Sequence, residues 1–268
     1  MINRICISIN NHCNLACRYC HFHEKGHIEV ADMNVFEILD HVKAYAKSNF
    51  KIGFVGNGEA FLDWPLLKSC IRYIEDCPII SAYTITNGTV ALPDEEWLFL
   101  EDHKINVGFS IDGYRELHNL NRCNSFDRAL ENVENYKRVT GHYPTFNATV
   151  GRDSLENADK VIEFFARFGT RVTFSRMIGE HGIPLDEYRK FLDYAGERIP
   201  VRRGDKDCTM YGGQCGAGTN NYFFANGKIY YCGNCVDLPP LGPSSTSFFE
   251  LEKICLDFDR NHCYKESL

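Results

Sequence analysis

The sequence predicts an α/β protein with a mostly parallel sheet, and two observations lead to this expectation. Six short β-rich segments alternate with amphipathic segments between residue 5 and about residue 200, as parallel strands joined by right-handed helical crossovers do. After Pro200 the composition changes, and four cysteines lie within 28 residues around the dipeptide Asn226-Gly227, which is typical of a hairpin turn. We therefore expect an α/β domain over residues 1–200 and a small cysteine-rich hairpin domain over residues 201–268.

The individual elements follow from periodicity. Apolar and polar side chains alternate over residues 5–9, which predicts the first strand. Further strands are expected at residues 51–55, 83–86, 106–111, 145–150 and 171–176. Apolar residues recur with the helical period at residues 34–48, 65–76, 94–101, 125–138 and 154–168. A hairpin over residues 221–231 and a helix over residues 248–258 complete the expected tail.

Composition excludes several classes of protein. The net charge is −7 and no basic block stands out, which argues against nucleic-acid binding. No apolar run approaches the roughly 20 residues of a membrane span, and the amino terminus lacks a signal peptide. Thirteen cysteines without a secretion signal favour metal binding in a reducing cytoplasm over disulfides. Because the chain starts at its first strand, we expect no additional amino-terminal recognition domain.

Three thiols fall within eight residues directly after the first strand, at Cys13, Cys17 and Cys20. Thiolates suit iron–sulfur clusters and zinc. Three of them on one loop could hold three corners of a four-iron cube and leave one iron open to a non-protein ligand. A zinc knuckle or three unrelated buried cysteines are the alternatives, although zinc sites usually close with four protein ligands.

The C-x3-C-x2-C spacing with the aromatic Tyr19 before the last cysteine resembles the signature of the radical S-adenosylmethionine (radical SAM) superfamily. The resemblance implies a partial, six-stranded (β/α) barrel. It also implies a [4Fe-4S] cluster on Cys13, Cys17 and Cys20, whose open iron chelates the amino and carboxylate groups of SAM. An electron donor such as flavodoxin or ferredoxin is the implied partner.

The same resemblance implies SAM contacts at the carboxyl ends of the later strands. The turn Gly-Asn-Gly-Glu after the second strand resembles a Gly-Gly-Glu turn that contacts the SAM ammonium, with Asn57 in a glycine position. The segment Ser-Ile-Asp-Gly after the fourth strand resembles a strand end near the SAM ribose or carboxylate, although an ordinary Asp-Gly turn would look the same. The candidate SAM-binding residues are Tyr19, Gly58, Glu59, Ser110, Asp112, Asn147 and Arg176.

The cysteine-rich tail resembles the SPASM domains and the shorter twitch domains of radical SAM enzymes, which hold auxiliary [4Fe-4S] clusters. A full SPASM domain needs seven or eight ligating cysteines, and this tail has six, so we expect one auxiliary cluster. The expected ligands are Cys208, Cys215, Cys232 and Cys235, and Cys255 or Cys263 could replace one of them. A structural zinc site with the same four ligands is the alternative.

These features predict reductive cleavage of SAM to a 5′-deoxyadenosyl radical, which takes hydrogen from a C–H bond of a peptide or small natural product. In the favoured version the auxiliary cluster accepts an electron, and the product is oxidised or crosslinked. In the alternative, an epimerase, Cys255 or Cys263 is the catalytic hydrogen donor. A non-catalytic zinc or iron–sulfur scaffold is the alternative of another class, and it leaves the Gly58-Glu59 turn and the six βα units unexplained.

Overall fold

Six parallel strands form the main part of the structure. The computed structural model describes all 268 residues except 21–32, 203–207, 212, 255 and 267–268. The strands are β1 (Arg4–Ile7), β2 (Phe50–Phe54), β3 (Ile80–Thr86), β4 (Asn106–Ser110), β5 (Thr145–Val150) and β6 (Val172–Arg176). They lie side by side in chain order, and right-handed crossovers that all advance in the same direction place the helices on one face of the sheet. The alternation predicted the parallel sheet, and its curvature gives the partial six-stranded barrel that the resemblance implied.

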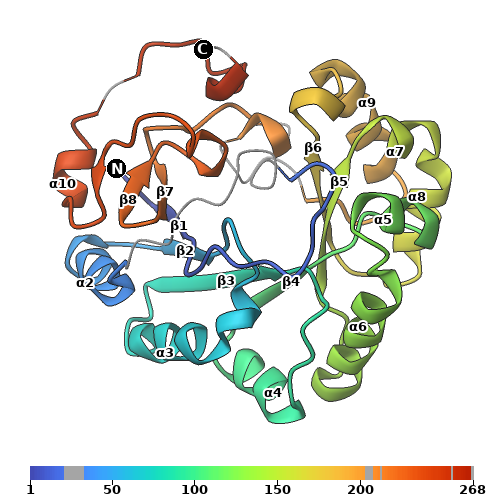
Figure 1. Cartoon of the computed structure of the whole chain (residues 1–268), viewed down its shortest axis with the longest axis horizontal. Coiled ribbons are helices and arrows are strands. Elements are labelled where there is room, and N and C mark those ends of the chain that lie inside the picture. Colours follow the sequence, from blue (N-terminus) through green and yellow to red (C-terminus); the bar gives the residue numbers. More distant parts are fainter. Residues whose placement is uncertain (21–32, 203–207, 212, 255, 267–268) are drawn as a thin grey trace.

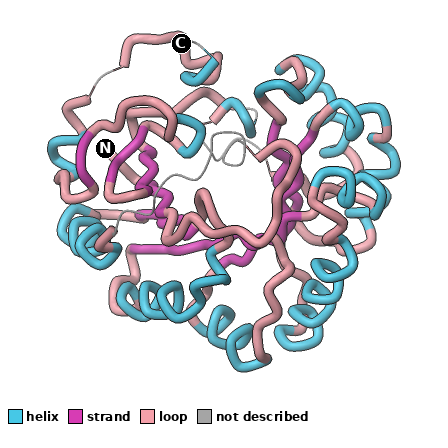
Figure 2. Tube along the Cα trace, viewed as in Figure 1, coloured by secondary structure: helices cyan, strands magenta, loops and turns pink. Residues whose placement is uncertain are grey.

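The helices lie on the convex side of this sheet (Figures 1 and 2). They are α2 (Val35–Tyr45), α3 (Trp64–Ile74), α4 (Asp94–Asp102), α5 (Arg115–Asn121), α6 (Phe126–Thr140), α7 (Arg152–Glu156), α8 (Ala158–Ala166) and α9 (Leu185–Gly196). Their apolar faces supply the core, in which Trp97 of α4 and Tyr136 of α6 pack edge to face. In the described part of the chain, no helix is long and apolar enough to cross a membrane.

The two faces of the strands differ in polarity, and this difference creates the site. On β5, Phe146, Ala148 and Val150 are buried against the helices. The alternate positions Thr145 and Asn147 are only half-buried and point to the concave side, because successive strand residues point to opposite faces. We call this concave side the lumen. It is lined by polar side chains, whereas the core lies outside the strands.

The tail extends the same sheet. Strand β7 (Asn221–Ala225) pairs in parallel with β1 and antiparallel with β8 (Lys228–Tyr230), which pairs with β9 (Gly242–Pro243). The hairpin was predicted, and its turn has positive φ at Asn226 (54°) and Gly227 (69°), as an Asn-Gly turn between antiparallel strands requires. The sequence did not predict that β7 would lie against β1, so that one nine-stranded sheet joins both parts of the chain.

Three expectations about helices need correction. The helix expected over residues 248–258 is shorter than predicted: α10 spans only Phe248–Leu251. The helix expected over residues 154–168 is divided into α7 and α8 at Asn157, whose backbone leaves the helical region at φ −122° and ψ 34°. Helix α5 was not predicted at all, since its seven residues are too few to show a clear helical period.

Candidate metal and cofactor site

The loop that leaves the carboxyl end of β1 carries the three clustered thiols. Cys13 is exposed, and Cys17 and Cys20 are half-buried. Burial raises the pKa of Cys17 to about 12, and nearby charge on Cys20 and Cys13 contributes in the same direction. Burial also raises the pKa of Cys13. Cys13 and Cys17 therefore hold their protons at neutral pH, and metal binding has to release these protons.

None of the described residues forms a set of three or more His, Cys, Asp or Glu side chains that could hold a single metal ion. A cubane cluster does not require the three thiols to meet at a single metal ion, because each thiolate binds a different iron of the cube.

Asn87, at the exit of β3, holds the loop from one side. Its side-chain Nδ2 donates to Asn14 Oδ1 at 2.8 Å and lies 3.8 Å from Cys13 Sγ. Asn14 in turn donates to Thr89 Oγ1 at 2.8 Å. An amide N–H directed at a thiolate stabilises negative charge on the sulfur and on anything bound to it. Asn87 was not among the expected site residues, and its position at a strand's carboxyl end was the available signal.

A buried ion pair holds the loop from the other side. Arg122 Nε lies 3.1 Å from Asp112 Oδ2, with side chains 10% and 0% exposed. Tyr19 donates its hydroxyl to the same carboxylate at 2.9 Å, and the backbone N–H of Thr149 donates to Oδ1 at 2.9 Å. The Arg122 guanidinium also lies over the Tyr19 ring, 5.4 Å from its centroid. Asp112 therefore already has protein partners on both oxygens, and it links the thiol loop to the ends of β4 and β5.

The residues that follow α5 support this arrangement. The backbone N–H of Arg18 donates to the carbonyl of Asn121, and Cys123 Sγ donates to the carbonyl of Ala16. Positive φ at Cys123 (53°) lets the chain turn back toward the loop immediately after the helix. Arg122 was not among the expected site residues, because the short helix that presents it was not predicted.

The turn after β2 has a structural role in this arrangement. Glu59 is 3% exposed. Its carboxylate accepts from the backbone N–H of Phe61 at 3.1 Å and from that of Asn87 at 2.6 Å. Burial raises the pKa of Glu59, and these hydrogen bonds oppose the increase. Gly58 allows close approach of the thiol loop, since a Cβ there would lie 2.0 Å from Asn10 Oδ1 and 2.6 Å from the His12 carbonyl.

The remaining expected SAM contacts fall into two groups. Ser110 and Asn147 are register partners on β4 and β5, so their side chains share the luminal face. Neither side chain has a hydrogen-bond partner among the described residues, and both are available to a ligand. Arg176 is instead occupied, because it donates to the Ile183 carbonyl at 2.9 Å and forms an ion pair with Glu266 at 2.7 Å.

His118 of α5 lies beneath this network and predicts a pH dependence of stability. It is fully buried beside Ser125, with Nε2 2.9 Å from the hydroxyl. Burial lowers the pKa of His118 from 6.5 to about 4, and Arg122 lowers it further while Asp112 opposes the change. Between pH 6.5 and about 4, His118 is protonated in the unfolded chain but stays neutral in the folded chain. The free energy of unfolding therefore decreases as the pH falls from 6.5 toward 4.

At pH 5 we expect this loss in the free energy of unfolding to be about 2 kcal/mol, since about 1.5 pKa units separate pH 5 from the unfolded value. Urea unfolding of His118→Gln at pH 7 and pH 5 should show a correspondingly flatter profile than that of the wild type. His142→Gln is the matched control, because His142 is exposed. Equal pH dependence in the wild type and His118→Gln would contradict the assignment.

The tail thiols form a second group. Burial raises the pKa of Cys208 to about 12, and charge on Cys232, Cys263 and Cys215 contributes. Cys232 Sγ lies 3.3 Å from Cys235 Sγ. Cys263 is only 4% exposed and is likewise influenced by Cys232 and Cys215. The structure thus gathers the four expected cysteines and Cys263, while Cys255 lies outside the described residues.

Comparison with known proteins identifies the family of the chain. Residues 7–165, more than half of the chain, match the Radical SAM superfamily. The chain belongs to the radical SAM superfamily. This assignment accounts for the three-thiol loop, the glycine turn after β2 and strands β2 to β5, all of which lie within the matched residues.

Within the radical SAM superfamily, the chain is similar in sequence to anaerobic sulfatase-maturating enzymes. The cysteine-type anaerobic sulfatase-maturating enzyme of Clostridium novyi is 25% identical over 175 residues, 59% of this chain and 46% of that protein. The corresponding enzyme of Clostridium perfringens strain 13 is 32% identical over 172 residues, 57% of this chain and 45% of that protein. The matched part of this radical SAM chain thus spans about half the length of these curated relatives.

Solved structures support the fold. A structure of anSMEcpe with bound AdoMet covers 93% of this chain and 80% of its own, with a TM-score of 0.76 and 21% identity. Streptococcus suis SuiB bound to the precursor peptide SuiA covers 94% of this chain and 64% of its own, with a TM-score of 0.72 and 16% identity. The predicted radical SAM fold, a partial barrel with a cysteine-containing tail hairpin, is confirmed by these similarities.

The residues present fit the cofactors of the radical SAM superfamily. Cys13, Cys17 and Cys20 supply soft ligands without a fourth thiol on their loop, and Asn87 directs an N–H at the first of them. At the end of β2, the side chain of Asn57 is buried, and both its amide atoms lack a partner among the residues that the structure describes. A buried amide without a partner is costly, and a polar ligand in contact with it would remove that cost.

Proposed function

We propose that this chain is a radical SAM enzyme that oxidises a peptide substrate. The observation that carries the proposal is the three-thiol loop at the carboxyl end of β1, held between Asn87 and the Asp112–Arg122 pair. In this superfamily the [4Fe-4S] cluster supplies an electron to bound SAM, which yields a 5′-deoxyadenosyl radical. The chain's own residues have to bind SAM, orient the substrate and exclude water.

Each part of the protein has its own role in this proposal. Cys13, Cys17 and Cys20 hold the SAM cluster. Ser110 and Asn147 present unpartnered polar groups from the luminal face to bound SAM. Glu59 and Asp112 keep the strand ends and the thiol loop in place through their hydrogen bonds to the backbone and to Tyr19. A protein electron donor such as flavodoxin or ferredoxin delivers the electron.

The tail supports oxidation over epimerisation. Cys263 is buried among Cys232 and Cys215, which favours it as a ligand of an auxiliary [4Fe-4S] cluster. A thiol that acts as a ligand is not free to donate hydrogen to a substrate radical. Five described thiols, the four expected cysteines and Cys263, compete for four ligand positions, and Cys263 could replace one of the expected four.

The proposal of a peptide substrate rests on the relatives. SuiB has been solved with a precursor peptide and anSMEcpe with the Cp18Cys peptide. A small natural product remains the alternative, and product analysis separates the two.

The test begins with anaerobic reconstitution, followed by incubation with SAM and dithionite. We expect iron and sulfide to be incorporated and 5′-deoxyadenosine to form, whereas zinc without iron would reject the proposal. Candidate peptides encoded by neighbouring genes are then incubated with the enzyme in heavy water. Oxidation lowers the product mass by about two units, since two hydrogens are lost, and adds no deuterium to carbon. A redox-neutral product carrying one deuterium would instead establish the epimerase.

A further inference from the structure

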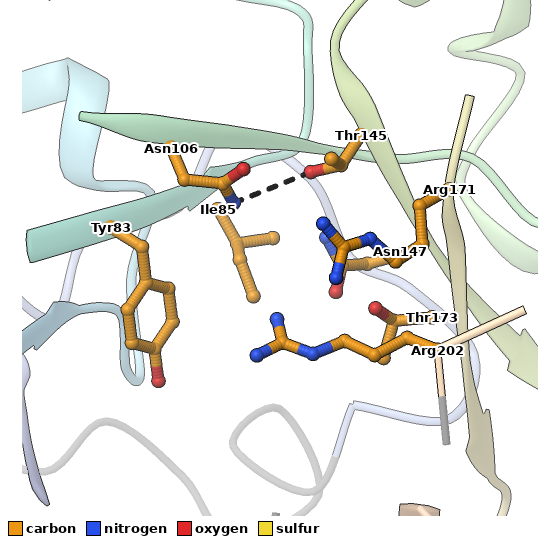
Figure 3. Close-up of a pocket in the computed structure, with 8 residues that line it drawn as sticks. All are labelled: Tyr83, Ile85, Asn106, Thr145, Asn147, Arg171, Thr173 and Arg202. Carbon is orange, nitrogen blue, oxygen red and sulfur yellow. Dashed lines mark hydrogen bonds between the residues drawn. The ribbon is translucent and has the colours of Figure 1, made fainter. Parts of the chain in front are cut away.

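A polar cavity lies in the lumen, toward the amino-terminal ends of the strands (Figure 3). The space between its lining residues measures about 350 Å³, part of it open to solvent. Strands β3, β4, β5 and β6 and the segments next to β6 contribute its walls. The lining residues are Tyr83, Ile85, Asn106, Thr145, Asn147, Arg171, Thr173 and Arg202.

Two arginines make this cavity positively charged. Arg171 and Arg202 extend their guanidinium groups into the same space, with Asn147 and Thr173 between them (Figure 3). None of the described residues that line the cavity is a carboxylate. The side chain of Arg171 makes no hydrogen bond or ion pair with the described part of the chain. Guanidinium groups bind carboxylates through two parallel N–H···O bonds, so this cavity has the donors that suit a carboxylate.

Two glycines on the strands provide the space that the polar side chains of the cavity occupy. A Cβ at Gly108 of β4 would lie 2.2 Å from Asn147 Nδ2, so only glycine at this position admits the Asn147 amide to the lumen. Likewise, a Cβ at Gly53 of β2 would lie 2.5 Å from the Tyr83 ring. The bare backbone at Gly53 and Gly108 thus allows Tyr83 and Asn147 to face the cavity.

The cavity lies directly below the expected position of SAM. Asn147 is the register partner of both Ser110 and Thr173. Two residues further along β5, the backbone of Thr149 binds Asp112, which belongs to the network beneath the thiol loop. Two strand residues span about 7 Å. A group bound beside Asn147 and Thr173 is therefore only one layer of side chains away from the reaction site.

We propose that this cavity binds a carboxylate of the substrate between Arg171 and Arg202. The inference rests on the proposed function, and it specifies the class of substrate: a peptide with an acidic side chain or a free carboxyl terminus near the carbon that loses hydrogen. The two guanidinium groups hold the carboxylate at the lower end of the lumen. The remainder of the substrate extends toward the carboxyl ends of the strands, where the thiol loop lies.

The test measures binding of a small probe to the reconstituted protein by calorimetry at low salt. The probes are glutarate, its neutral analogue glutaramide and inorganic phosphate. Glutarate should bind, and glutaramide should bind at least about tenfold more weakly, because it lacks the charge that contributes to hydrogen bonds with arginine. Arg171→Gln should weaken glutarate binding by at least about tenfold, and Arg171→Lys by less, since it keeps the charge but loses the fork.

Arg128→Gln is the matched control, because Arg128 is an exposed arginine of α6 outside the cavity, and it should bind glutarate like the wild type. Equal binding of glutarate and glutaramide, or undiminished glutarate binding by Arg171→Gln, would overturn the proposal. Phosphate binding tighter than glutarate binding would replace the carboxylate with a phosphate group. Calorimetry needs no turnover of SAM, so failure of the carboxylate site and failure of the proposed enzyme activity are separate results.

Discussion

Replacing Cys13, Cys17 and Cys20 together with alanine should abolish SAM cleavage, the largest effect that we expect from any substitution. The reconstituted triple variant should lose about four irons, which make up one cubane cluster, and it should keep the irons bound by the tail. The reason is geometric: these three thiols are neighbours on one loop, and the tail thiols form a separate group. Iron and sulfide analysis together with chromatographic detection of 5′-deoxyadenosine measures both effects.

Two further variants control this experiment. Replacing Cys208, Cys215 and Cys263 with alanine should remove the complementary set of about four irons. Cys77→Ala should lose none, because Cys77 follows α3 and its thiol donates a hydrogen bond to Asp76, far in the sequence from both thiol groups. Formation of 5′-deoxyadenosine by the Cys13/Cys17/Cys20 triple variant would show that the thiol loop has been assigned wrongly.

Arg122→Met should cause the second-largest effect, a loss of about 3 kcal/mol in the free energy of unfolding. The substitution leaves the Asp112 carboxylate, whose side chain is 0% exposed, buried without its cation. The hydrogen bonds from Tyr19 and Thr149 remain, so the cost lies at the lower end of the range for broken buried pairs. Because Tyr19 precedes Cys20, iron incorporation should fall as well. Urea unfolding and iron analysis measure these two effects.

A double variant separates the buried charge from the loss of packing. Asp112→Asn keeps an acceptor for Tyr19 and for the Thr149 N–H but removes the negative charge. The double variant Asp112→Asn/Arg122→Met should therefore be more stable than Arg122→Met alone. Arg115→Met is the surface control: Arg115 pairs with Asp127 on the exposed side of α5 and α6, and such pairs contribute little. Equal stability of the single and double variants would mean that the pair acts only through packing.

Local patterns predicted the parts of the structure that local chemistry determines. The three-thiol loop and the Asn226-Gly227 turn are encoded within a few residues, and both appear where the sequence places them. The parallel pairing of the six strands followed from their alternation with helices, and their chain order followed from the barrel that the resemblance implied.

The contacts that complete the site could not be predicted in the same way. Asn87 and Cys13 are 74 residues apart, and Tyr19 and Asp112 are 93 residues apart. No local pattern signals such contacts. The resemblance grouped Ser110 with Asp112 as SAM contacts, whereas in the structure Asp112 is occupied by Tyr19 and Arg122 and Ser110 is not. Which polar group at a strand end stays available for a ligand depends on these long-range partners.

The pairing of β1 with β7 has a consequence for the order in which the chain can fold during synthesis. Strand β1 is made first, yet one of its two neighbours, β7, starts at Asn221. Until that residue leaves the ribosome, β1 has an open edge with unsatisfied N–H and C=O groups, and such edges invite intermolecular pairing. The thiol loop emerges from this same strand. We therefore expect its iron–sulfur cluster to be assembled only after β7 has left the ribosome and closed the edge from which the loop departs.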